Sequence, residues 1–201
     1  MTEEMAIDPN ALDALLPGLS GETLSALVAQ ASPETARKLV ERVDPGTFDL
    51  SLIDHAGIDP TVFDPDIVAH VIRNTPEEKL EEAMTGELRD VIVPEVMRRM
   101  PERLNEESSA TVEGAIQWIV TRNGGEPDRY AIVIDKGTCE LVSDLDGEPR
   151  VTIEVGPVEF LKVVTANANP VELFMSGKLR VVGDLMFGAS IPSLFRLPDP
   201  G

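Results

Sequence analysis

The chain has 201 residues, of which 42% are hydrophobic, and a formal net charge of −19 from 17 basic and 36 acidic side chains. This hydrophobic content is sufficient for a folded core and excludes a disordered composition. The charge repels phosphate backbones and anionic membrane surfaces, so we expect neither nucleic-acid binding nor adsorption to anionic membranes.

The cysteine content and the two ends of the sequence bear on location. The single cysteine, Cys139, excludes an internal disulfide and a zinc site made of several thiolates. No run approaches the ~18 apolar residues of a membrane-spanning helix, so we expect no stable membrane insertion. Residues 1–10 lack the apolar centre of a signal peptide, and the last five residues carry no peroxisomal address. We therefore expect a cytoplasmic, reduced protein.

Residues 8–104 carry a helical pattern that is interrupted often. Proline follows a capping residue at six places, which is typical of helix starts because proline has no N–H to leave unpaired. We expect several short helices, including one that starts at a capping box of Thr75 and Glu78 and a pair separated by Gly86. A break or kink is expected near Pro94. We interpret residues 1–86 as an acidic helical region in front of a domain formed by residues 87–201.

Three segments of this region, which begin at residues 7, 43 and 58, share the order apolar-Asp-Pro-x-x-apolar-Asp-x-x-apolar. Their irregular spacing excludes a regular solenoid. Two explanations stay open, a reused helical turn and chance similarity. The acidic charge either favours solubility or attracts a basic partner.

Arg98, Arg99 and Arg103 fall near the end of a predicted helix, where the helix dipole favours cations, so we interpret them as structural.

From residue 111 the apolar residues recur with a period of two. Strands are predicted over residues 111–120, 129–135, 138–144 and 150–155, and short loops join them. Because a parallel crossover needs a long connection, we expect an antiparallel meander with one face on a core and the other in water. The first strand places five residues on one face: Val112, Gly114, Ile116, Trp118 and Val120.

Helices and one more strand close the sequence. Residues 158–167 and 170–177 are predicted helices, and Asn169 is the expected cap of the second because Pro170 follows it. Residues 178–184 form a predicted fifth strand. Asp184 is the expected N-cap of a last, apolar helix.

This order of elements resembles the sterol carrier protein 2 (sterol transfer) family, over roughly residues 97–197. The resemblance implies an α+β fold, in which helices cover one face of a five-stranded, mainly antiparallel sheet and enclose a hydrophobic cavity for a sterol, fatty acid, phospholipid or acyl-CoA. The all-helical region in front departs from the family. We interpret the Gly-Asp pair as a strand-to-helix hinge and not as a site of chemistry. The resemblance is carried by Gly177, Lys178, Leu179, Val181, Gly183 and Asp184.

The last helices carry more apolar side chains than a helix packed on one side requires, and such a surface usually binds something. An ordinary dry core is the alternative at each position. We predict that the cavity is lined by Ile116, Trp118, Val120, Phe160, Val164, Phe174, Met175, Leu185, Met186, Phe187, Ile191, Leu194 and Phe195.

The sequence shows no assembled catalytic site. His55 and His70 are not in a metal-binding spacing, and Cys139 lies in a strand without a histidine partner. We therefore expect no catalytic residue, no metal and no cofactor. The first hypothesis is a non-catalytic protein that binds or transfers a lipid. The alternative is an interaction or accessory module of a lipid-metabolising enzyme complex, in which the N-terminal helices dock a partner.

Overall fold

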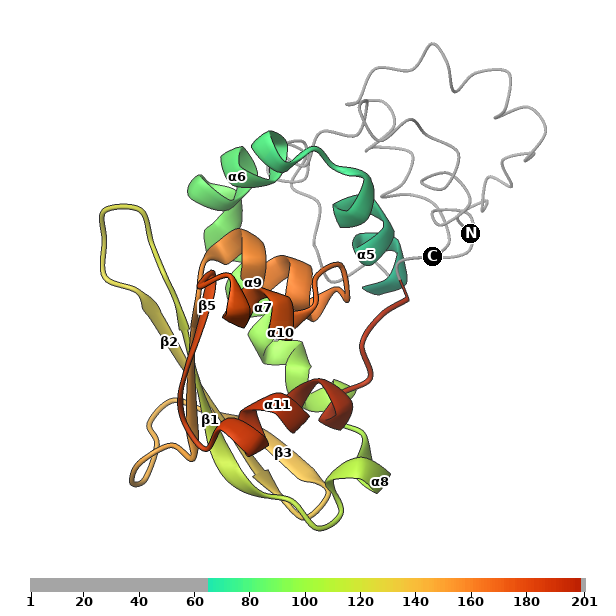
Figure 1. Ribbon diagram of the computed structural model, residues 1–201, viewed down its shortest axis with the longest axis vertical. Helices are drawn as coiled ribbons and strands as arrows, with labels where there is room; N and C mark the ends of the chain where they lie inside the picture. The colour runs from blue at the N-terminus through green and yellow to red at the C-terminus, as the bar shows by residue number, and fades with distance from the viewer. Residues whose placement is uncertain (1–64, 200–201) are drawn as a thin grey trace, which may run out of the picture.

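The computed structural model describes residues 65–199, and a five-stranded sheet is its centre (Figure 1). The strand order is β3-β2-β1-β4-β5, and three of the four pairings are antiparallel. The predicted α+β fold with a mainly antiparallel sheet is therefore confirmed. The strands are β1 (Glu113–Val120), β2 (Asp128–Asp135), β3 (Thr138–Val142), β4 (Val151–Val155) and β5 (Leu179–Gly183).

Helices precede the sheet in sequence and follow its fourth and fifth strands. In Figure 1, α7, α9, α10 and α11 lie on one side of the sheet. None of the helices within residues 65–199 is long and apolar enough to cross a bilayer. The helices are α5 (Pro65–Asn74), α6 (Glu77–Thr85), α7 (Glu87–Arg99), the 3-10 helix η3 (Met100–Arg103), α8 (Glu106–Ser109), α9 (Pro157–Val164), α10 (Pro170–Met175) and α11 (Leu185–Leu194).

The expected meander is wrong at the fourth strand, because β4 pairs in parallel with β1 and not with β3. The connection between β3 and β4 has eight residues, 143–150. It is long enough for this crossover because β3 ends at nearly the level along β1 at which β4 begins. Val142 is level with Gln117 of β1, through their shared partner Ala131, and Val151 pairs with Ile116. The chain therefore crosses the width of the sheet without running back along its length.

The predicted buried face of β1 is confirmed. Ile116, Trp118 and Val120 are buried, and they belong to one hydrophobic cluster that also contains residues of β4 and α9. Leu80 and Met84 of α6 are in the same cluster. The domain boundary at residue 86 stays a prediction, while α6 on one side of it shares a core with the sheet on the other.

Helix caps were predicted with mixed success. The Asn169 and Asp184 side chains accept hydrogen bonds from the N–H groups of Val171 and Phe187, both at 2.9 Å, so these caps are confirmed. The capping box at Thr75 is wrong, because its hydroxyl donates to the Val71 carbonyl at 2.7 Å and finishes α5.

Interruptions along the helical region were also partly predictable. Two helices meet at Gly86 as predicted. Of the break or kink predicted near Pro94, the break is wrong, because α7 runs unbroken from Glu87 to Arg99, and the kink stays a prediction. The similar segments at residues 7 and 43 and His55 lie outside the described residues, and the segment at residue 58 enters them only with its last three residues, at the start of α5.

A buried arginine that the sequence analysis did not single out fixes α7 against the sheet. The Arg89 side chain is 4% exposed, and its Nη1 lies 2.5 Å from Asp128 Oδ2. Its Nη2 donates to the carbonyl oxygens of Val120 and Thr121, at 3.2 and 3.0 Å. Removal of either partner would leave the other charge buried and unpaired, which is unfavourable. This contact therefore stabilises the position of α7 against the sheet.

Candidate functional site

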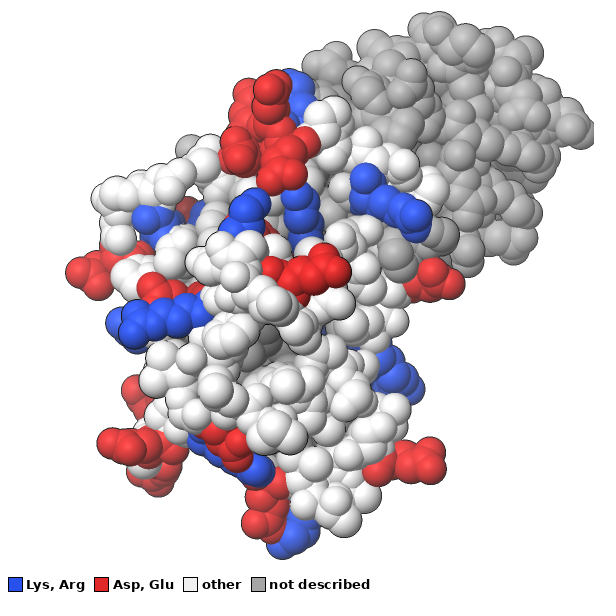
Figure 2. Space-filling model, in the orientation of Figure 1, with Lys and Arg blue, Asp and Glu red and all other residues white. Residues whose placement is uncertain are grey.

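A large apolar cavity lies between the sheet and the helices, with a volume of about 1200 Å³. It is bounded by residues of β1, β4 and β5, by α7 and η3, and by α9, α10 and α11 with the segment that follows α11. Figure 2 shows a hollow between α10 and α11 on a largely uncharged face. Protein pockets for small molecules usually hold ~300–1,000 Å³, so this cavity is large enough for a lipid-sized guest.

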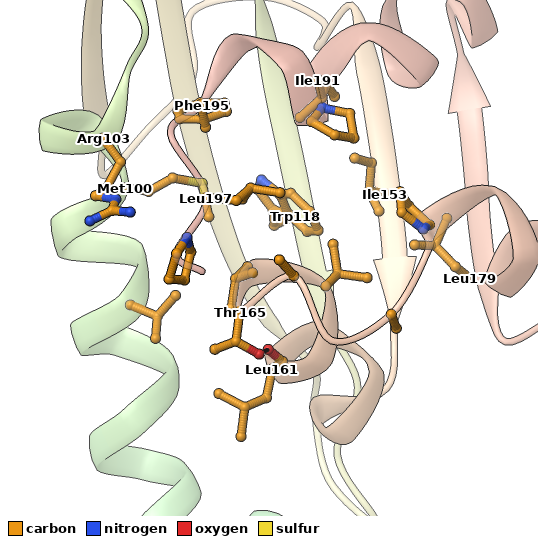
Figure 3. A pocket seen from close by; sticks show the side chains of 18 of the residues that line it. Met100, Arg103, Trp118, Ile153, Leu161, Thr165, Leu179, Ile191, Phe195 and Leu197 are labelled. Carbon is orange, nitrogen blue, oxygen red and sulfur yellow. Dashed lines mark hydrogen bonds between the residues drawn. The ribbon is translucent and has the colours of Figure 1, made fainter. Parts of the chain in front are cut away.

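The sheet forms the floor of the cavity. Trp118 of β1, Ile153 of β4 and Leu179 of β5 lie between α11 and α9 in Figure 3. The Trp118 ring meets Phe160 edge to face, with 5.6 Å between ring centroids. The Trp118 side chain is buried, and its Nε1 has no hydrogen-bond partner among the described residues. The floor is therefore apolar except for this one N–H group.

The polar groups of the α9 wall are turned toward the backbone. Thr165, which follows α9, donates its hydroxyl to the Leu161 carbonyl at 2.6 Å. The same hydroxyl accepts a hydrogen bond from Asn167 Nδ2 at 3.0 Å. Thr165 therefore offers the cavity its methyl group more than its oxygen.

The wall made by α7 and η3 contains the basic cluster. Arg98 and Arg99 both bind the Glu95 carboxylate, at 2.7 and 2.6 Å, and these contacts lower the pKa of that carboxyl below its ordinary value. Arg103 Nε donates to the Arg196 carbonyl at 2.7 Å, which holds the segment after α11 against η3. These contacts agree with a structural role.

The model for the SCP-2 sterol transfer family matches residues 95–196. The chain belongs to this family. "Oleate-induced peroxisomal protein POX18" of Candida maltosa is 31% identical over 96 residues, which are 47% of this chain and 76% of that protein. "Peroxisomal multifunctional enzyme type 2" of Mus musculus is 23% identical over 112 residues, and the match spans 15% of that enzyme and 55% of this chain.

Among solved structures, the apo form of sterol carrier protein 2 from Yarrowia lipolytica is 20% identical. It covers 56% of this chain and 94% of its own, with a TM-score of 0.44. The matched residues of the family model contain every strand of the sheet and the helices α9, α10 and α11. The cavity therefore lies mainly within the SCP-2 domain, with α5 adding part of one wall.

The hinge of the SCP-2 domain sets the position of α11. Gly183 has φ +104°, and a Cβ there would lie 2.5 Å from the Arg150 carbonyl oxygen, so the position favours glycine. Asp184 caps α11 and also binds the Arg150 side chain, with Oδ2 2.8 Å from Nη2. The backbone N–H of Phe187 and then Arg150 lower the pKa of Asp184.

The other two motif residues lie at the start of β5. Gly177 has φ +77° in the turn before the strand, and Lys178 Nζ lies 3.3 Å from Glu159. Arg150 is the partner of this motif that sequence reasoning missed, since a lone arginine before a strand gives no signal of its role. These contacts position the walls of the cavity and do not involve Trp118, Ile153 or Leu179 of its floor.

The structure divides the thirteen residues predicted to line the cavity into three groups. Two of them, Met175 and Met186, are 81% and 83% exposed and do not line the cavity. Five do not reach the cavity because they are buried in the sealed core: Ile116, Val120, Phe160, Phe187 and Leu194. Six do line it: Trp118, Val164, Phe174, Leu185, Ile191 and Phe195. That these six bind a ligand stays a prediction.

Several residues of the wall were not in the predicted set. Ile92, Val96 and Met100 line the cavity from α7 and η3. The sequence contained a usable signal for them, since they form an apolar stripe at helical spacing in a helix that the resemblance does not fully cover. Leu197 and Ile153 also line the cavity, and only the crossover of β4 and the path after α11 bring them there.

The candidates for chemistry lie elsewhere in the fold. Cys139 is half-buried on β3, and burial raises the pKa of its thiol to about 11, so it is protonated near neutral pH. His70 Nε2 lies 3.2 Å from the Asn74 side-chain nitrogen within α5. Within residues 65–199 no group of three or more His, Cys, Asp or Glu side chains is placed to hold a metal.

Proposed function

We propose that this protein is a non-catalytic lipid carrier, which binds a sterol, a fatty acid or an acyl-CoA in its cavity and transfers it. The observation that carries the proposal is the cavity itself, about 1200 Å³ of space with walls made largely of Val, Ile, Leu, Met and Phe side chains. A lipid is the class of molecule whose surface such walls match.

The expected affinity follows from the buried surface. Covering a few hundred Å² of apolar lipid is worth on the order of 10 kcal/mol at ~25 cal/mol per Å². Loss of translational and rotational freedom offsets much of this gain. We expect a dissociation constant near the micromolar range, which corresponds to about 8 kcal/mol, with loose selectivity among chain lengths.

The rim of the opening supports transfer between membranes. Val171 and Phe174 of α10 and Leu185 of α11 line the cavity and are also 45–56% exposed. Met175 and Met186, next to them in sequence, are more exposed still. An apolar rim around an opening suits brief contact with a bilayer surface while a lipid enters or leaves. Because the net charge is −19, we expect zwitterionic bilayers to be preferred.

A pair of substitutions tests transfer separately from binding. Met175→Glu with Met186→Glu places charge on the rim but outside the cavity. We expect the transfer rate of a fluorescent fatty acid between phosphatidylcholine vesicles to fall about tenfold or more, while the equilibrium dissociation constant stays within about twofold. Val91→Glu, at another exposed apolar position on α7, is the matched control. Unchanged transfer in the double variant contradicts the proposed route, and a wild-type protein that binds none of several lipids contradicts the proposal as a whole.

We also propose a cytoplasmic location and the absence of catalysis. The protonated thiol of Cys139 and its distance in the fold from the cavity walls support the second point. Subcellular fractionation tests the first, and recovery of an unmodified lipid after prolonged incubation with the protein tests the second. A chemically altered lipid recovered in proportion to protein concentration contradicts the absence of catalysis.

One observation favours a second candidate, an accessory module that works with a lipid-metabolising enzyme. The mouse relative is named as a multifunctional enzyme, and the match occupies a small part of it. Native mass spectrometry of gently purified protein separates the two candidates. Co-purified lipid on a single chain supports the carrier, and a stable complex with an enzyme and no lipid supports the module.

A further inference from the structure

One buried polar group in the cavity wall has no partner among the described residues. The Trp118 side chain is 3% exposed, it lines the cavity, and its Nε1 has no hydrogen-bond partner among residues 65–199. An indole N–H is only a donor, and a buried donor without an acceptor is unfavourable. Most buried side-chain polar atoms in proteins do have partners. The unpaired N–H at this position therefore calls for an acceptor that residues 65–199 do not supply.

Three other polar side chains around the cavity have partners within the protein. The Thr165 hydroxyl donates to a carbonyl, Arg99 binds Glu95, and Arg103 donates to the Arg196 carbonyl. Figure 3 shows the Trp118 ring at the centre of the cavity floor, with its nitrogen on the side that faces Met100. This nitrogen makes no hydrogen bond to any acceptor in the described part of the chain. Trp118 Nε1 is thus a buried donor without a partner in a floor whose other residues, Ile153 and Leu179, are apolar.

We propose that Trp118 Nε1 donates a hydrogen bond to an oxygen of the bound lipid, and this inference rests on the proposed carrier function. The ligand class is then an apolar molecule that carries an acceptor oxygen, such as a carboxyl or a hydroxyl group. The oxygen lies at the sheet, next to Trp118, and the hydrocarbon part fills the remaining cavity. A pure hydrocarbon of equal length leaves the N–H unpaired and binds more weakly.

The substitution Trp118→Phe keeps an aromatic ring at the floor and removes the donor. With dodecanoic acid and dodecanol, each delivered from cyclodextrin, we expect the variant to bind about tenfold more weakly, which is the effect of one hydrogen bond of about 1.4 kcal/mol. With dodecane we expect the same affinity for both proteins. Tyr130→Phe is the matched control, because Tyr130 pairs with Trp118 across β1 and β2 but does not line the cavity.

A second measurement uses the unaltered protein. Trp118 is the single tryptophan of the chain, so its indole N–H gives a single side-chain signal in a ¹H–¹⁵N correlation spectrum. We expect saturation with dodecanoic acid or dodecanol to move the proton of this signal downfield, and saturation with dodecane to leave it without such a shift. A response to the acid alone assigns the acceptor to a carboxylate, and a response to both assigns it to any acceptor oxygen.

The outcomes separate this inference from the function on which it rests. If the wild type binds all three ligands with equal affinity and the indole signal does not move downfield, the inference is overturned and the carrier function stands. If the wild type binds none of the three, both are overturned. The spectrum of the wild type decides the question even where the Trp118→Phe protein folds poorly.

Discussion

The helix-covered face of the sheet is divided between a sealed core and an open cavity, although the same strands supply both. Along β1, Ile116 and Val120 are fully buried in the core, while Trp118 between them faces the cavity. Along β4, Val151 contacts α11 near Gly188, and Ile153 faces the cavity. The difference depends on the space between α9 and α11 above the sheet, and not on the chemistry of the strand residues.

Two phenylalanines sharpen this comparison most strongly. Phe160 of α9 is fully buried, and Phe174 of α10 is 45% exposed at the rim. We expect Phe160→Ala to lower the free energy of unfolding by about 3–5 kcal/mol, because it opens a void in packed surroundings. Phe174→Ala is expected to cost about 1 kcal/mol or less, and to weaken lipid binding instead.

Urea unfolding of both variants, together with a lipid titration of each, measures the two effects. Similar losses of stability in the two proteins would mean that the rim is packed as tightly as the core.

Two valines on α9 test the same difference between core and cavity, because each is replaced by tryptophan. Val158 is buried in the core, and Val164 lines the cavity. Val158→Trp forces a large ring into packed space and is expected to destabilise the protein by about 1–3 kcal/mol. Val164→Trp places its ring in free space, so we expect little loss of stability and at least about tenfold weaker lipid binding, equivalent to about 1.4 kcal/mol.

Thermal unfolding and a fatty-acid titration check this pair. If Val164→Trp binds lipid as tightly as the wild type does, the ligand is not in this cavity.

The smallest expected effect on stability comes from Asp184, in the hinge that precedes α11. The pKa of Asp184 is below its ordinary value of 3.8, first because Phe187 donates a backbone hydrogen bond and then because of Arg150. A lowered folded-state pKa means that the carboxylate adds stability above the unfolded pKa, and that this stability is lost as the pH falls through the lower folded value. Asp184→Asn retains a cap but loses the charge.

We therefore expect the wild type to be more stable than Asp184→Asn above about pH 4, and the difference to shrink below it. Urea unfolding of both proteins between about pH 2 and pH 6 measures this difference. A difference that does not change over that range would show that the charge of Asp184 has no part in fixing the hinge.

The sequence was sufficient for the five strands, for the helices that follow them and for the buried face of β1. The alternation around Trp118 predicted the buried face of β1, and Asn169 and Asp184 predicted two helix starts, because these signals are local. The partner of β4 was not predictable in this way. It depends on where β3 ends relative to β1, which is a property of the assembled sheet.

The cavity was predictable as a feature and only partly by residue. Periodicity distinguishes one face of a helix or strand from the other, but it does not distinguish a packed neighbour from an empty space on the same face. Phe187 and Ile191 show this on α11, since they lie one turn apart on one face, the first in the core and the second on the cavity wall. Met175 and Met186 were predicted to line the cavity because they are apolar, whereas both are largely exposed.

The central claim is that the space above Trp118 and Ile153 holds a lipid, and a crystal structure of the full chain loaded with dodecanoic acid tests it most directly. We expect elongated electron density between the sheet and α11, with the carboxyl oxygen within hydrogen-bond distance of Trp118 Nε1. Density confined to the outer surface, or side chains that have closed the space so that no alkyl chain fits, would contradict it.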